Sequence, residues 1–141
     1  MWVGKVSTLK SYCAYGLNSV KKVLVHRILI VDDERPIRSL LSTVLKRAGY
    51  DVQTAADGPE AITLCKSERF DLVLSDVIMP AMNGHELAQW IATNVPETRT
   101  ALMSGYDLRC DNCSFSPRCE LLPKPFMPSD AVKFVGNILA A

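Results

Sequence analysis

Two short aliphatic runs, each followed directly by aspartate, restrict most strongly what this chain can fold into. Residues 28–31 precede Asp32 and Asp33, and residues 72–75 precede Asp76. Runs of this length without polar alternation are typical of strands covered on both faces, as in parallel sheets. Open α/β sheets place their chemistry at the carboxyl ends of such strands, so we expect the three carboxylates to share one edge of the sheet. Converging acids repel one another unless a cation such as Mg²⁺ joins them.

Strand and helix signals alternate five times from residue 26 onward. We expect strands over 27–31, 51–55, 71–75, 99–103 and 121–123, and helices after Pro36, over 57–68 and 84–94, and after Pro128. Such alternation implies right-handed crossovers and a parallel sheet wrapped on both faces. The predicted fold class is α/β, a flavodoxin-like (βα)5 doubly wound sheet with strand order 2-1-3-4-5. That order brings the ends of the first and third strands together.

Helical spacing also predicts which side chains the helices bury. The first helix should end at Gly49 and present one apolar face, made of Ile37, Leu40, Leu41, Val44, Leu45 and Ala48. Asp57 and Glu60 read as a capping box that opens the second helix, where Cys65 should lie in the core. The third helix should bury Leu87, Ala88 and Ile91.

Charge divides the chain into two parts. Residues 1–27 contain five basic and no acidic residues, whereas the rest contains eleven basic and fifteen acidic residues. We therefore predict a basic, flexible extension over 1–25 and a single domain over 26–141. The extension is either disordered or a contact for a membrane surface or another acidic partner. Lacking a helix-turn-helix pattern, it gives weak grounds for nucleic-acid binding.

Composition excludes several other classes. No apolar run approaches the roughly 20 residues of a membrane span, and no secretory signal is evident. Five cysteines is an odd number, so a complete disulfide framework is not expected and a reducing, cytoplasmic setting is.

Four motifs, in order, resemble those of the response-regulator receiver domains of two-component signalling. They lie at residues 30–34, 75–80 with Asn83-Gly84 behind, 102–106 and 122–126, and the resemblance covers roughly residues 26–141. It implies that Asp76 accepts a phosphoryl group from a phosphohistidine, with Ser104 and Lys124 contacting the phosphoryl oxygens. It also implies a cis peptide between Lys124 and Pro125.

The resemblance further implies a Mg²⁺ cofactor. Its ligands would be Asp32, Asp33, Asp76 and the backbone carbonyl of Ile78, because hard cations prefer oxygen. Taken singly, each residue has a simpler explanation: Asp32 and Asp33 as a helix cap, Asp76 as the start of a loop, Lys124 as a surface lysine. Their joint placement at strand ends favours the phosphoacceptor site.

Three positions depart from the family pattern. Leu121 stands three residues before the lysine, where receivers usually have tyrosine or phenylalanine, so the usual aromatic readout of phosphorylation is in doubt. Tyr106 lies beside the entrance, where it would partly shield the phosphoryl group from water, and Ile78 is apolar and cannot orient a hydrolytic water. We therefore predict a long-lived acyl phosphate.

The segment over 107–119 is the most individual part of the chain. It is rich in residues that compete with helical hydrogen bonds and contains Pro117, so a degenerate or shortened fourth helix is expected. Its cysteines, Cys110, Cys113 and Cys119, are either free thiols, a redox pair, or metal ligands that need a fourth from Cys13 or a partner.

These observations favour a phosphoacceptor response regulator, a signalling protein that catalyses only its own phosphorylation and dephosphorylation. Its partners would be a sensor histidine kinase or phosphotransfer protein and a downstream protein. With no effector after Ala141 we expect a stand-alone switch, monomeric or dimerising on phosphorylation. The alternative is a phosphorylation-independent binding or redox- or metal-sensing module that uses the cysteine segment.

Overall fold

Five parallel strands form one sheet in a computed structural model that describes residues 25–105 and 120–140. The strands are β1 (Arg27–Val31), β2 (Asp51–Ala55), β3 (Leu72–Asp76), β4 (Arg99–Ser104) and β5 (Glu120–Pro123), and the helices are α2 (Arg35–Arg47), α3 (Gly58–Ser67), α4 (Gly84–Asn94) and α5 (Pro128–Ala140). The strand order is β2-β1-β3-β4-β5, which confirms the predicted flavodoxin-like topology. The segment expected to hold a degenerate fourth helix lies outside the described residues.

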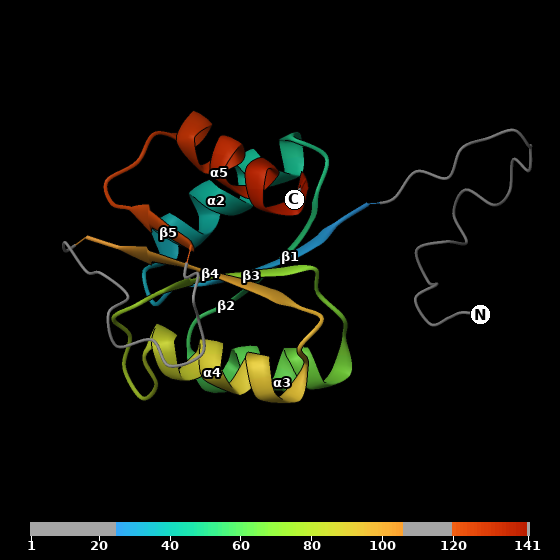
Figure 1. Cartoon of the computed structure of the whole chain (residues 1–141). Coiled ribbons are helices and arrows are strands. Elements are labelled where there is room, and N and C mark those ends of the chain that lie inside the picture. The colour runs from blue at the N-terminus through green and yellow to red at the C-terminus, as the bar shows by residue number, and fades with distance from the viewer. Residues whose placement is uncertain (1–24, 106–119, 141) are drawn as a thin grey trace, which may run out of the picture.

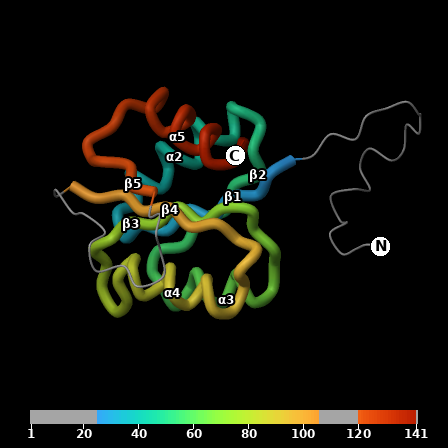
Figure 2. The backbone as a smooth tube through the Cα atoms, in the orientation of Figure 1, coloured from blue at the N-terminus to red at the C-terminus, as the bar shows by residue number. Residues whose placement is uncertain are grey.

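The helices cover both faces of the sheet (Figure 1). α2 and α5 lie together on one face, and α3 and α4 lie on the other, as the tube in Figure 2 also shows. Along β1, Ile28 and Ile30 face the α2 and α5 layer, whereas Leu29 and Val31 face the α3 and α4 layer. A strand with apolar neighbours on both sides needs apolar residues at every position, which explains the unbroken aliphatic run.

Side-chain caps begin the two helices on the lower face of Figure 1. Asp57 accepts a hydrogen bond from the backbone N–H of Glu60 at 2.9 Å, as predicted. The expected reciprocal bond differs, because the Glu60 carboxylate accepts from the N–H of Ala56 at 2.8 Å, one residue before the cap. α4 begins with a complete capping box between Asn83 and Glu86.

The buried face of α2 is narrower than the apolar face predicted from the sequence. Leu41 and Leu45 are fully buried, but Leu40 is 36% exposed and Ala48 is also exposed. α2 contacts the sheet and α5 through a narrow stripe, so the outer members of the apolar pattern remain at its edge. The core predicted for α4 is confirmed, since Leu87, Ala88 and Ile91 are buried.

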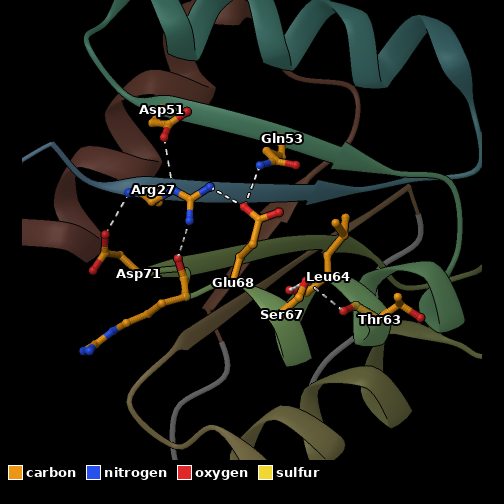
Figure 3. Close-up of polar contacts among 9 residues, drawn as sticks. Arg27, Asp51, Gln53, Thr63, Leu64, Ser67, Glu68 and Asp71 are labelled. Carbon is orange, nitrogen blue, oxygen red and sulfur yellow. Dashed lines mark hydrogen bonds and ion pairs between the residues drawn. The ribbon is translucent and has the colours of Figure 1, made fainter. Parts of the chain in front are cut away.

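Arg27 forms a polar network at the amino ends of the strands, opposite the carboxyl ends that carry the three aspartates (Figure 3). Its guanidinium pairs with Asp51 at 3.0 Å and Glu68 at 2.6 Å and donates to the Arg69 carbonyl. Its backbone N–H donates to the Asp71 carboxylate at 2.7 Å. The network joins the starts of β1 and β2 to the chain between α3 and β3, so it braces the end of the sheet remote from the site.

Among the described residues, no helix has the length and apolarity needed to cross a membrane.

The thiol of Cys65 is expected to resist alkylation in the folded protein. Cys65 is buried as predicted, and burial raises the pKa of its thiol to about 11. At pH 8 about one thiol in a thousand is then ionised, and only the thiolate reacts. Iodoacetamide labelling followed by peptide mass spectrometry should leave the Cys65 peptide unmodified until urea is added. Equal labelling rates with and without urea would contradict this.

Candidate functional site

Three carboxylates meet at the carboxyl ends of β1 and β3. The register pairs Val31 with Ser75, so Asp32 lies beside Asp76. Ligand oxygens of Asp32, Asp33 and Asp76 all lie within 4.8 Å of one another. Asp32 is fully buried and Asp76 is 8% exposed, whereas Asp33 is exposed. This is the convergence that the sequence predicted for this edge of the sheet.

Lys124 supplies positive charge to the carboxylates. Its ammonium nitrogen lies 3.1 Å from an Asp32 oxygen, 3.4 Å from an Asp76 oxygen and 3.9 Å from a Glu34 oxygen. The side chains of Lys124, Asp32 and Asp76 are at most 17% exposed, so the two pairs with the aspartates are only weakly screened by water, whereas Glu34 is exposed. A single lysine cannot neutralise three acids, and the site keeps an excess of negative charge.

The loop after β5 and the end of β4 hold Lys124 in place. The Lys124 N–H donates to the Ser104 carbonyl at 2.7 Å, and the following peptide, Lys124–Pro125, is cis, as predicted. Ser104 is buried and pairs in register with Pro123. The serine and the lysine therefore lie next to each other at the ends of neighbouring strands.

Burial and neighbouring charge change the protonation equilibria of this site. Burial, reinforced by the negative charge of Asp32, raises the pKa of Asp76, and Lys124 offsets only part of that rise. Burial alone would lower the pKa of Lys124, but its hydrogen bond to Asp32 and the charges of both aspartates outweigh burial and raise it. The folded protein thus favours a charged Lys124 and resists ionisation of Asp76.

Asp76→Asn is expected to stabilise the metal-free protein at neutral pH by roughly 1–3 kcal/mol. Because the pKa of Asp76 is higher in the folded than in the unfolded state, its ionisation costs stability above the folded-state pKa, and the cost disappears as pH falls below the unfolded-state value. The advantage of asparagine should therefore shrink with falling pH. Urea unfolding in EDTA, at neutral and at acidic pH, measures both values.

Asp57→Asn is the matched control for this measurement. Asparagine caps a helix as well as aspartate does, so this isosteric change should alter stability by only a few tenths of a kcal/mol. A wild-type protein that is more stable than Asp76→Asn at neutral pH would contradict the prediction.

The loop after Asp76 is tightly constrained. Ala81 has a φ of 70°, and the Met82 N–H donates to the Pro80 carbonyl at 2.7 Å, which closes a γ-turn. At the loop's end Gly84 lies so close to Asp76 that a Cβ on Gly84 would overlap the Asp76 carbonyl oxygen. The absence of a side chain at Gly84 lets α4 begin directly against the strand that carries Asp76.

Other predicted residues are distributed around this centre. Ile78 lies two residues after Asp76 and is 56% exposed, at the rim of the site. Leu121 is half-buried on β5 and pairs in register with Leu102. Tyr106 and the cysteines of 107–119 lie outside the described residues.

Sequence reasoning missed Arg38. Its guanidinium donates to the main-chain carbonyl of Asp32 at 2.7 Å. The available signal was an arginine in the first turns of a helix that begins just after an acidic pair.

A hollow of about 310 Å³ also lies beside Lys124, lined by Ile37, Leu40, Gly105, Lys124, Pro125 and Phe126.

Comparison with known proteins relates this geometry to one family. A sequence model of the response regulator receiver domain matches residues 28–133. The response regulator receiver protein CpdR of Brucella abortus is 33% identical over 117 residues, which cover 82% of this chain and 98% of CpdR. Several matched relatives named as probable transcriptional regulators are longer, and this chain spans about half their length.

Solved structures agree with that relation. The chemotaxis response regulator CheY4 of Vibrio cholerae has a TM-score of 0.75 and 31% identity, covering 82% of this chain and 99% of CheY4. TrrA of Thermotoga maritima, solved in complex with Mg²⁺ and BeF, has a TM-score of 0.73 and 34% identity, covering 81% of this chain and 99% of TrrA.

Proposed function

The chain belongs to the response regulator receiver domain family of two-component systems, and from that membership we propose that it is a switch phosphorylated on Asp76. The observation that carries the proposal is the cluster of Asp32, Asp33 and Asp76 within 4.8 Å, with Lys124 against it. Residues 26–141 would form the receiver unit, working in the cytoplasm.

In the proposed transfer, an Asp76 oxygen forms a bond to the phosphorus of a phosphohistidine on a sensor kinase or phosphotransfer protein. The bond between phosphorus and the imidazole nitrogen breaks, and the electron pair leaves with the imidazole, which takes up a proton. Lys124 would then exchange its contact with the Asp76 carboxylate for one with a phosphoryl oxygen. Ser104, buried next to Lys124, would donate its hydroxyl to another. Positioning and charge neutralisation are what this reaction needs from a protein.

Mg²⁺ is the proposed cofactor, held by the carboxylates of Asp32, Asp33 and Asp76 and by the carbonyl of Ile78. The donor set fits, because three hard oxygen ligands share a site where, among the described residues, the negative charge of the carboxylates exceeds the positive charge of Lys124. When bound, the cation neutralises charge that develops on the phosphoryl oxygens. Asp32 and Asp33 contribute by holding it next to Asp76 without themselves attacking.

The hollow beside Lys124 supports a protein partner as the phosphodonor. Its walls are mostly apolar and open next to the lysine, so a partner surface could bury apolar side chains there while presenting its phosphohistidine to Asp76. The output would be a changed surface that a downstream protein reads, through a monomer or a phosphorylation-dependent dimer.

Phosphorylation by a small donor tests the proposal without knowledge of the kinase. Wild-type protein incubated with acetyl phosphate and Mg²⁺ should gain the mass of one phosphoryl group, measured on the intact protein. Asp76→Asn should gain none, and Asp57→Asn, which keeps the site, should gain one. The absence of any Asp76-dependent adduct would reject the phosphoacceptor function and favour a phosphorylation-independent module.

The acyl phosphate is expected to persist for minutes or longer. Ile78 is 56% exposed at the rim of the site and has no polar atom on its side chain with which to orient an attacking water. Ile78→Asn supplies such a group and should shorten the lifetime several-fold, whereas Ile78→Val should leave it unchanged. Decay after removal of the phosphodonor, followed by intact mass, gives the half-life; a value of seconds for the wild type would contradict the prediction.

A further inference from the structure

Arg38 reaches from α2 to the end of β1. Its Nη1 donates a hydrogen bond of 2.7 Å to the main-chain carbonyl oxygen of Asp32. The arginine is half-buried, and the bond spans the turn that links the strand to the helix. The proposed phosphotransfer assigns this residue no role.

Arg38 completes the hydrogen bonding of Asp32. The Asp32 N–H donates to the Ala55 carbonyl at 3.2 Å, one carboxylate oxygen accepts from the N–H of Glu34 at 2.8 Å, and the other accepts from Lys124 at 3.1 Å. The remaining polar atom is the carbonyl oxygen that Arg38 bonds. Since Asp32 is fully buried, losing that donor would leave a buried carbonyl unsatisfied.

The same carbonyl belongs to the peptide plane that joins Asp32 to Asp33. Asp33 is exposed, and within the described ranges no hydrogen bond or ion pair holds its carboxylate. Its oxygen nevertheless lies within 4.8 Å of those of Asp32 and Asp76. Arg38 therefore anchors the peptide from which the Asp33 side chain projects.

We propose that Arg38 is a positioning residue for the cation site, which fixes the Asp32–Asp33 peptide so that the Asp33 carboxylate faces the shared ligand position. This inference rests on the proposed function, because it requires that the three carboxylates bind Mg²⁺. Arg38 acts through Asp32 and Asp33 and contacts neither the metal nor the phosphoryl group.

Charge and position predict opposite results for the loss of Arg38. A guanidinium near a divalent cation repels it, so on charge alone its removal would tighten Mg²⁺ binding. If Arg38 aims Asp33, its removal weakens Mg²⁺ binding. The direction of the change therefore separates the two roles.

The test is a Mg²⁺ titration of the full chain, followed by backbone amide NMR shifts, which reports binding without phosphorylation. Arg38→Gln should weaken Mg²⁺ binding at least about tenfold, the usual effect of losing a residue that orients a ligand. Arg35→Gln is the matched control, because Arg35 is an exposed arginine on the same helix; Mg²⁺ binding should be unchanged or slightly tighter. Arg38→Lys should fall between Arg38→Gln and the wild type, and it carries the test if Arg38→Gln fails to fold. Unchanged or tighter binding by Arg38→Gln would overturn the inference.

A double-mutant cycle with Asp33→Asn tests the route of the effect. If Arg38 works by aiming Asp33, adding Arg38→Gln to Asp33→Asn should weaken Mg²⁺ binding much less than it does in the wild type. If the effects of Arg38→Gln and Asp33→Asn on the free energy of Mg²⁺ binding were fully additive, the inference would be overturned. If the wild type binds Mg²⁺ and Arg38→Gln binds it equally, the positioning role alone fails; if the wild type binds no Mg²⁺, the proposed cation site fails, and the positioning role fails with it.

Discussion

Lys124→Met is expected to slow phosphorylation of Asp76 by at least about a hundredfold and to destabilise the metal-free protein by roughly 2–4 kcal/mol. Lys124 is the cation that the structure places against Asp32 and Asp76, at 3.1 and 3.4 Å. Methionine has a similar length but no charge, so the carboxylates would face one another without compensation. Phosphorylation by acetyl phosphate measures the first effect, and urea unfolding in EDTA the second.

Mg²⁺ and acid should each reduce that loss of stability. A bound cation would replace part of the missing positive charge, because a ligand that binds only the folded state stabilises it. Low pH should also narrow the difference between variant and wild type, because protonated carboxylates no longer repel one another. Lys133→Met, which removes an exposed lysine of α5, should change stability by less than about 0.5 kcal/mol. Equal stability of Lys124→Met and Lys133→Met in EDTA would contradict the expectation.

Gly84→Ala is the second substitution with a large expected effect, a destabilisation of about 3 kcal/mol together with impaired phosphorylation. A Cβ at this position would overlap the carbonyl oxygen of Asp76 and approach the Cα of Val77 at 3.0 Å. Both neighbours are backbone atoms of the strand end, so neither can rotate away. Relief requires either the start of α4 or the backbone at Asp76 and Val77 to move, and movement of that backbone would displace the Asp76 carboxylate.

Gly136→Ala is the control for a glycine in a helix with space around it. The atom nearest to an added Cβ there is the Tyr50 hydroxyl oxygen, at an ordinary contact distance of 3.8 Å. Alanine in the interior of α5 should raise stability by about 0.5–1 kcal/mol. Thermal or urea unfolding of both variants should therefore show changes of opposite sign; a neutral Gly84→Ala would show that the loop can shift at no cost.

The predicted boundaries of β1, β2 and α4 match the structure, and those of the other elements differ by one or two residues. These elements were predictable because their signals are local: aliphatic runs for strands, Asp57 as a helix cap, and Gly49 with a φ of 103° after α2. Helix faces were predicted less well. Leu40 fits the apolar spacing of α2 and is nevertheless 36% exposed, because only packing against the sheet decides how wide the buried stripe is.

The features of the site likewise fall into those that the sequence predicts and those that it does not. The proximity of Asp32, Asp33 and Asp76 could be predicted from the sequence, because all three follow the carboxyl ends of strands that are neighbours in the predicted strand order. Glu60 binding back to Ala56, the γ-turn at Ala81 and the bond from Arg38 could not be inferred, since each depends on side-chain reach or local backbone geometry.

The sequence by itself therefore determined the parallel sheet and which acids, hydroxyl and lysine stand at its carboxyl edge. Apolar periodicity and chain connectivity are sufficient for that, because they leave few ways to bury the strands. Only the tertiary structure decided that Lys124 faces two buried aspartates, that Gly84 leaves no room beside Asp76, and that Arg38 secures the peptide before Asp33. These are contacts between segments distant in the sequence or across tight turns, where a few tenths of an ångström decide which atoms meet.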